Sequence, residues 1–149
     1  MNGIPRIPLL LGLAGLLPFL WGVLTAISPI DGVTDYFQGW AVLADYAMVI
    51  LPFMSGVIWG FATKATGKQA TTLYVLSVIP ALWAFFFILE ETALLSAAVG
   101  FVVLLPIDYA CHRAGLAPPW WMRLRLILTG VVVPCLVIGH LVSAPSFVS

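Results

Sequence analysis

Five long apolar stretches constrain the fold of this chain more than any other feature. A helix rises about 1.5 Å per residue, so about 20 apolar residues cross the roughly 30 Å of a bilayer's hydrocarbon core. Only 8% of the 149 residues are charged and the mean hydropathy is +1.13, whereas roughly a quarter of a soluble protein is charged. The sequence therefore predicts an all-α, polytopic membrane protein, a bundle of five transmembrane helices. The spans are expected at 7–27, 37–62, 71–89, 92–111 and 122–142.

The segments between these stretches are short and contain polar or turn-forming residues. None of them is long enough to hold a soluble domain. Neighbouring helices joined by tight turns run antiparallel. We therefore predict a single domain over 1–149.

The first stretch shares some features with a secretory signal, because Arg6 precedes the apolar run and the small-residue segment Ala26-Ile27-Ser28 follows it. Signal cores are usually about 7–15 residues long. This run is longer and contains Pro18. We expect the segment to be retained as the first span.

The charged residues predict the orientation of the bundle. In the five-span layout every Lys and Arg falls on one side: Arg6, Lys64, Lys68, Arg113, Arg123 and Arg125. The acidic residues of the links fall on the other: Asp31, Asp35, Glu90 and Glu91. An even number of spans would scatter the basic residues, so this sorting independently supports five. Lys and Arg near span ends stay cytoplasmic, which predicts a cytoplasmic N-terminus and a C-terminus on the opposite side. We expect the bacterial inner membrane, or the mitochondrial inner membrane if the chain is eukaryotic.

Each span contains one interior proline: Pro18, Pro52, Pro80, Pro106 and Pro134. A proline removes a backbone hydrogen bond and kinks a helix, although membrane helices tolerate it where neighbours satisfy the freed carbonyl. Two interpretations follow from this pattern. The prolines are simply tolerated, or the kinks open an internal cavity or permit a rocking motion.

Gly56 and Gly60 form a Gly-x-x-x-Gly pair on the second span. Such pairs let two helix backbones approach closely. We expect this face to contact another helix of the same chain rather than to form a dimer.

Asp45 and His140 are ionisable residues within spans, where an uncompensated charge is costly. Both fall in the third of the bundle farthest from the basic side, with Glu90 in the link above them. A carboxylate near an imidazole can relay protons or bind a cation. The alternative interpretation is that Asp45 caps or hydrogen-bonds near the interface and that His140 faces lipid headgroups.

The fourth and fifth spans are joined by a basic, tryptophan-lined hairpin. Asp108 comes within reach of Arg113, Arg123 or Arg125 when the hairpin closes. Arg125 is the expected mate, because Asp108 lies about one turn inside the fourth span and Arg125 about one turn inside the fifth. We expect a structural ion pair there. In the alternative, the hairpin binds an anionic lipid headgroup or substrate. Its other candidate residues are Arg113, Trp120, Trp121 and Arg123.

No motif indicates an enzyme. The sequence has no Gly-rich phosphate loop, no His-Glu-x-x-His and no Cys-x-x-Cys. His112 and His140 fall on opposite sides of the membrane, so they cannot ligate one haem together. The net charge is zero and basic residues do not cluster away from span ends, which excludes a nucleic-acid partner. We predict no catalytic residue, no metal site and no cofactor.

The chain resembles the transmembrane protein 69 family, small multi-span proteins of bacterial and mitochondrial membranes. The residues that carry the resemblance are Pro8, Gly12, Gly15, Pro18, Phe19, Trp59, Gly60, Ser77, Pro80, Leu82, Asp108, Trp120, Trp121, Leu124, Arg125, Leu128 and Thr129. Ile58 stands where the family pattern often has a histidine, so no role for a histidine is transferred to that position. The resemblance implies an integral inner-membrane protein of unknown function and assigns no catalytic residue.

Two function hypotheses follow. The first is a structural or accessory component of a membrane complex, whose partners are membrane lipids and other membrane proteins. The second is a small transporter or a ligand-binding bundle that uses a proton-linked site at Asp45 and His140. The tryptophan-rich sensory proteins, which bind porphyrins or sterols, are similar to this chain in length, span number and tryptophan content. Their characteristic loop after the first span is not found in 28–37.

Overall fold

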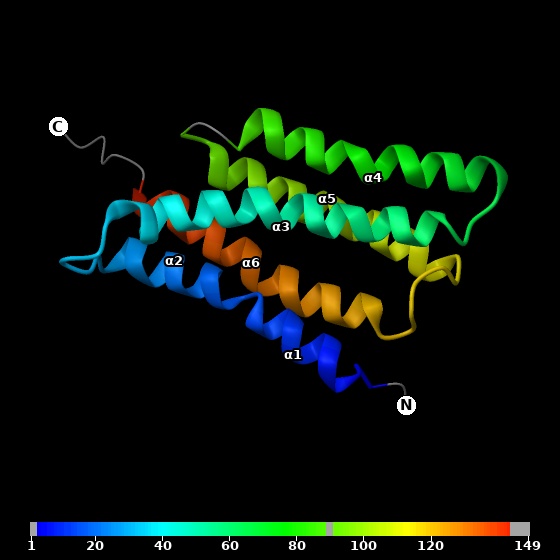
Figure 1. Cartoon of the computed structure of the whole chain (residues 1–149), viewed down its shortest axis with the longest axis horizontal. Coiled ribbons are helices and arrows are strands. Elements are labelled where there is room, and N and C mark those ends of the chain that lie inside the picture. The colour runs from blue at the N-terminus through cyan, green and yellow to red at the C-terminus, as the bar shows by residue number, and fades with distance from the viewer. Residues whose placement is uncertain (1–2, 89–90, 144–149) are drawn as a thin grey trace.

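The computed structural model describes residues 3–88 and 91–143, and the regular elements in this part of the chain are helices (Figure 1). They are α1 (Arg6–Ala14), α2 (Leu17–Ile27), the short 3-10 helix η1 (Asp35–Phe37), α3 (Gly39–Ala62), α4 (Gly67–Phe87), α5 (Ala93–Arg113) and α6 (Trp121–Ser143). Five segments of the described chain are long and apolar enough to cross a membrane, with α1 and α2 together forming the first. The predicted five-span, all-α architecture is confirmed. Which end faces the cytoplasm remains a prediction.

The start of α4 is the helix end that differs most from its predicted position. The helix begins at Gly67 rather than at residue 71, and all other span ends lie within two residues of their predicted positions. Gly67 has a φ of 57°, which glycine adopts without steric cost and which turns the chain out of α3. Lys68 then occupies the first turn of α4, where its long stem lets the ammonium group reach the membrane surface.

α3 lies at the centre of the bundle. It contacts α2, α4, α5 and α6, whereas α1 packs mainly against α6. Figure 1 shows α4 along one side of α3, and α2 and α6 along the other. The core of the protein is therefore built around the side chains of α3.

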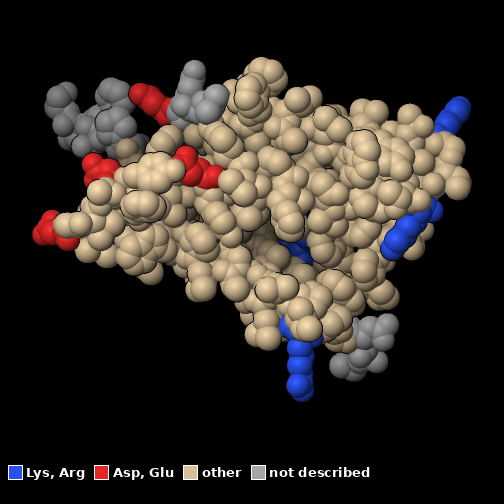
Figure 2. All heavy atoms as spheres, in the orientation of Figure 1, with Lys and Arg blue, Asp and Glu red and all other residues tan. Residues whose placement is uncertain are grey.

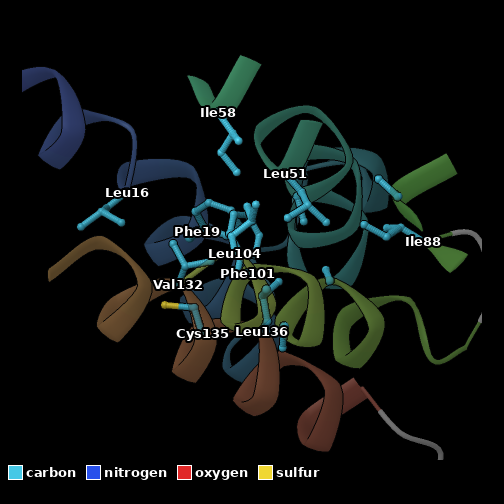
Figure 3. Packing of buried hydrophobic residues seen from close by; sticks show 14 of the residues in the cluster. Leu16, Phe19, Leu51, Ile58, Ile88, Phe101, Leu104, Val132, Cys135 and Leu136 are labelled. Atoms are coloured by element: carbon cyan, nitrogen blue, oxygen red, sulfur yellow. The ribbon is translucent and has the colours of Figure 1, made fainter. Parts of the chain in front are cut away.

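Three glycines let neighbouring helices approach the leucines of α3. A Cβ on Gly22 of α2 would lie 2.7 Å from Leu43, and a Cβ on Gly100 of α5 would lie 2.5 Å from Leu51. Gly139 of α6 faces Leu43 in the same way. Both leucines are fully buried, and Figure 3 shows Leu51 within the apolar core. Because interiors are close-packed, a larger residue at these glycines would displace the leucines.

Gly56 and Gly60 do not make the contact within the chain that the sequence predicted. Both are exposed on α3, and a Cβ at either position would meet no atom within 4 Å. That prediction is wrong because Gly22, Gly100 and Gly139, on other helices, already provide the close approaches to α3. The Gly56–Gly60 face is left toward the surroundings of the protein.

The first span is interrupted between α1 and α2. The break falls at Gly15-Leu16, and Pro18 lies in the first turn of α2. Proline has no N–H to donate to the carbonyl of Ala14, four residues earlier, and its ring crowds that carbonyl, so the helix ends and restarts there. The other four span prolines lie inside continuous helices, Pro52, Pro80, Pro106 and Pro134.

The loop between α2 and α3 is held by hydrogen bonds from two uncharged side chains, those of Thr25 and Gln38. The hydroxyl of Thr25 donates to the carbonyl of Trp21 and accepts a bond from the N–H of Gly39, each at 2.8 Å. The side chain of Gln38 makes two further hydrogen bonds to the backbone of the loop. Together these bonds hold the start of α3 against the end of α2.

The charged groups gather at opposite ends of the bundle, as Figure 2 shows for one face. Lys and Arg lie at the start of α1, at the α3–α4 turn and at the α5–α6 turn, which we call the basic end. Asp31, Asp35 and Glu91 lie in the links of the other end, which we call the acidic end. The predicted sorting of the charges therefore matches the course of the helices.

Candidate functional site

The α5–α6 turn begins with a helix cap that one glycine makes possible. Gly115 has a φ of 70° and donates its N–H to the carbonyl of His112 at 3.1 Å. Leu116 donates to the carbonyl of Cys111 at 3.0 Å, which completes the pair of bonds of a Schellman cap. The cap satisfies carbonyls at the end of α5 and reverses the chain, so that α6 starts at Trp121 beside α5.

Asp108 of α5 is held by two donors from α6. Nε of Arg125 lies 2.6 Å from Oδ2, and Nε1 of Trp121 lies 2.8 Å from Oδ1. The side chains of Asp108 and Arg125 are each 2% exposed. Trp121 and Arg125 are four residues apart and therefore share one face of α6. We call these three residues the α5–α6 clamp.

The carboxylate of Asp108 satisfies the condition under which a buried charge is tolerated. Moving an ion out of water costs several kcal/mol unless the ion is paired and its remaining polar atoms are hydrogen-bonded. Both carboxylate oxygens of Asp108 accept a bond, so its charge is compensated on both sides. The arrangement ties the fourth span to the fifth within the apolar part of the bundle.

The end of α3 packs onto the clamp. The ring of Phe61 meets the indole of Trp121 edge to face, with ring centres 5.5 Å apart. Nζ of Lys64 lies 3.5 Å from the carbonyl oxygen of Leu116 in the turn. Three helices therefore meet at the basic end.

The other candidate residues of the hairpin lie outside the clamp. Arg113 and Arg123 are exposed, and within the described chain neither forms an ion pair. Trp120 is half-buried, with its ring centre 6.2 Å from that of Trp121. Sequence reasoning named Arg125 as the mate of Asp108 but missed the indole of Trp121 as second donor. The available signal was the four-residue spacing of Trp121 and Arg125.

A cavity of about 110 Å³ lies beside the clamp, next to the break in the first span. Its walls come from α1, α2, α3, α5 and α6, and Figure 3 shows Leu16, Phe19, Phe101 and Val132 grouped on this side of the core. The polar side chains in its lining are those of Arg125 and Thr129 of α6. The sequence did not indicate this cavity, because it depends on where the first span breaks.

Asp45 and His140 are not brought together. Asp45 is exposed on α3, and His140 is half-buried near the end of α6. Leu43, which packs against Gly139, lies about 200° around α3 from Asp45, so Asp45 points away from α6. No hydrogen bond or ion pair connects Asp45 to His140 in the part of the chain that the structure describes. The hollow at the acidic end, of about 330 Å³, is lined by neither, and Glu90 lies outside the described residues.

Residues 3–88 and 91–143 do not bring together side chains that could bind a metal ion. These residues contain no group of three or more His, Cys, Asp or Glu side chains placed to hold a metal ion. Cys111 and Cys135 are both buried free thiols.

The five spans and the buried clamp define a small polytopic α-helical membrane protein. The chain belongs to the family described as "Protein of unknown function (DUF3429)", whose model matches residues 4–141. It is also 35% identical over 147 residues to Transmembrane protein 69 of Xenopus tropicalis, a match that covers 94% of this chain and 55% of that protein. The chain thus spans about half the length of this relative. No solved structure matches it. The resemblance to the transmembrane protein 69 family is confirmed, and with it the assignment to a membrane family of unknown activity.

Proposed function

We propose that this protein is a non-enzymatic accessory component of a membrane complex and that it binds a partner protein through one face of α3. The membrane we propose is the bacterial inner membrane, or the mitochondrial inner membrane in a eukaryote. The observation that carries the proposal is an exposed stripe along α3 that combines small residues with a carboxylate. Its residues are Asp45, Val49, Phe53, Gly56 and Gly60, and we call it the α3 stripe.

The α3 stripe is continuous and suited to a helix. At 3.6 residues per turn its five residues fall within a sector of about 80°. Val49 and Phe53 are 63% and 66% exposed, and the two glycines have open space where a Cβ would be. Without a hydrophobic driving force in lipid, helices associate by close packing at small residues and by polar contacts. The stripe offers both.

Asp45 supplies the polar contact. It lies in the second turn of α3, and among the described residues no hydrogen bond or ion pair compensates it. A carboxylate that faces lipid within a span is costly and is usually kept for a partner. A donor on a partner helix, either a basic side chain or an amide, would offset this cost.

The partner is best described as a transmembrane helix of another protein, with small residues opposite Gly56 and Gly60 and a donor opposite Asp45. A second copy of this chain fits less well. Two copies related by an axis along the membrane normal would place the Asp45 carboxylates at the same depth on facing stripes. Like charges in that position repel one another.

The packing at mid-bilayer favours this function over transport. A carrier needs a polar path to the middle of the membrane. Leu43, Leu51, Leu104 and Leu136 are fully buried along the centre of the bundle, and Asp45 lies outside it. The cavity beside the clamp is also smaller than the engineered cavity of about 150 Å³ that holds one benzene molecule, so a porphyrin or a sterol does not fit inside it.

Photo-crosslinking in the native membrane tests the proposal. A photoreactive amino acid at Val49, on the stripe, should give a discrete heavier product. The control is the same amino acid at Leu126 of α6, which is 54% exposed and lies outside the stripe, and it should give no such product. Gly56→Leu should abolish the product, whereas Gly130→Leu, at an exposed α6 glycine with equally open space, should preserve it. The partner, identified by mass spectrometry, should then bind the purified wild type and not Gly56→Leu.

Two outcomes count against the proposal. Equal crosslinking from Val49 and Leu126 means that the stripe has no preferred neighbour. A product that contains only two copies of this chain means that the stripe forms a homodimer and does not bind another protein.

A further inference from the structure

We propose that the cavity beside the clamp binds the ester group and the first few methylene groups of one acyl chain of a membrane phospholipid, whose ester carbonyl accepts hydrogen bonds from Arg125 and Thr129. This inference does not require a partner protein, and its test is separate from that of the α3 stripe, with which the cavity lining shares Phe53. It rests on the position of the cavity, on two unpartnered polar groups and on the charge state of the clamp.

The cavity opens toward lipid. Leu11 of α1 and Phe53 of α3 belong to its lining and are 68% and 66% exposed. Figure 2 shows a hollow in this face of the protein with a basic side chain at its floor, in agreement with Arg125 as the basic residue in the cavity lining. An occupant therefore enters from the side, out of the bilayer, rather than from water.

Both polar side chains of the lining carry a buried atom without a partner. Nη2 of Arg125 and Oγ1 of Thr129 make no hydrogen bond within the described structure. Arg125 is bound to Asp108 through Nε, which leaves the rest of the guanidinium available. Buried polar groups normally form hydrogen bonds, and a buried group without a hydrogen-bond partner costs about 1–3 kcal/mol of stability. Two such groups in the lining of one cavity indicate that an acceptor is bound there.

The acceptor is a neutral oxygen rather than an anionic one. Asp108 already compensates the charge of Arg125 at 2.6 Å, so a phosphate or carboxylate in the cavity would add an unpaired negative charge to a buried site. A carbonyl oxygen accepts hydrogen bonds from Nη2 and from the hydroxyl without adding a charge. The remaining lining consists of aliphatic and aromatic side chains, methionine and glycine, which suits an alkyl chain.

The depth of the site matches a phospholipid ester. Arg125 lies four residues and Thr129 eight residues after the first residue of α6, Trp121, so they are about 6 Å and about 12 Å along the helix. Ester carbonyls of a bilayer lie just below its headgroups. From there the first methylene groups would lie against Phe101 and Val132, which also line the cavity, and the rest of the chain would lie in the bilayer.

A comparison of two synthetic lipids tests this site in the full chain. Dioleoyl phosphatidylglycerol has two ester carbonyls, and its diether analogue has the same headgroup and alkyl chains without them. Binding is measured by titrating each lipid into the protein in mild detergent and following the melting temperature, with retention in native mass spectrometry as a second readout. The diester should bind more tightly, by roughly 2- to 10-fold for each net hydrogen bond that its carbonyls accept.

Variants assign the difference to the cavity. Thr129→Val removes the hydroxyl at nearly constant shape and should lower the diester-to-diether ratio of affinities, while Thr129→Ser should keep it. Thr72→Val, which removes a hydroxyl from the exposed face of α4, is the matched control and should leave the ratio unchanged. Because Oγ1 of Thr129 has no partner within the described structure, Thr129→Val is expected to fold as the wild type does.

Equal affinities for the two lipids in the wild type would overturn the proposal. So would a preference for the diester that persists in Thr129→Val, because the carbonyl would then be recognised elsewhere. If the wild type showed no preference for the diester but bound a decyl benzoquinone saturably, the proposal would also be overturned. The ligand would then be a quinone, whose ring carbonyl would accept the hydrogen bonds.

Discussion

Asp108 and Asp45 both lie within spans, and the comparison between them separates two uses of a charge in a membrane. Asp108, at the basic end, is buried and accepts hydrogen bonds from Trp121 and Arg125 on the neighbouring helix. Asp45, toward the acidic end, is exposed on α3 and has no described partner. The first carboxylate is compensated inside the fold, and we infer that the second is compensated from outside it.

The surroundings of the two aspartates differ in the same sense. Around Asp108 the clamp, the Schellman cap and the ring of Phe61 join three helices. Asp45 instead lies at one end of the α3 stripe, with exposed Val49 one turn away and the two open glycines of the stripe farther along the helix. The role of an ionisable residue in a span therefore depends on the residues around it and not on its depth alone.

Arg125→Ala should have the largest effect on the folded state. It leaves Asp108 buried without its cation, and breaking a buried ion pair in this way typically costs about 3–5 kcal/mol of unfolding free energy. Unfolding in mild detergent by a denaturing detergent measures the loss. Arg123→Ala, two residues earlier and exposed, is the control and should change the value by less than about 0.5 kcal/mol. Equal unfolding free energies of the two variants would mean that the ion pair of the clamp does not stabilise the fold.

Trp121→Phe should have the next largest effect. The substitution removes the donor to Oδ1 of Asp108 while keeping a ring against Phe61, and a hydrogen bond to a charged group contributes about 1.5–3 kcal/mol. Trp120→Phe, at the half-buried neighbour, should cost clearly less. The same unfolding measurement applies, and a larger loss in Trp120→Phe would show that the wrong indole has been assigned.

Gly100→Ala and Gly60→Ala should shift stability in opposite directions. The Cβ at Gly100 meets Leu51 at 2.5 Å, and overpacking of this kind costs about 1–3 kcal/mol. The Cβ at Gly60 meets no atom within 4 Å, and alanine in an open helical position stabilises by about 0.4–1 kcal/mol. Destabilisation of the purified protein by Gly60→Ala would mean that the α3 stripe packs within the chain after all.

Asp45→Asn should have the smallest effect on stability and a clear effect on association. The exposed side chain contributes little to the fold, so the unfolding free energy should change by less than about 0.5 kcal/mol. Crosslinking from Val49 should nevertheless weaken, because the neutral side chain of asparagine accepts weaker hydrogen bonds than a carboxylate and forms no ion pair with a basic donor. A large loss of stability with unchanged crosslinking would reverse the assignment of the two aspartates.

Much of the architecture was predictable because it follows from length and periodicity. Apolar stretches fixed the number of spans, and the positions of Asp108 and Arg125, each one turn inside helices joined by a short turn, were enough to pair them. The basic residues sorted to one end for the same reason, since each lies near a helix terminus.

The remaining features depend on which side chains meet in three dimensions. Pro18 breaks its span while Pro52, Pro80, Pro106 and Pro134 do not, although all five read alike in sequence. Gly56 and Gly60 carry the familiar spacing, yet the close contacts are made by lone glycines that face the leucines of α3. The cavity at Thr129 arises only where the broken first span, α3 and α6 come together.

A double-mutant cycle on Asp108 and Arg125 tests most directly whether a compensated charge locks the basic end. The unfolding free energies of the wild type, Asp108→Ala, Arg125→Ala and the double variant give the coupling between the two side chains. Contacting charges in one network should couple by about 2–3 kcal/mol, so the double variant should be much less unstable than the sum of the two single losses. Additive losses, with a coupling below about 0.5 kcal/mol, would mean that the two residues do not act as a pair.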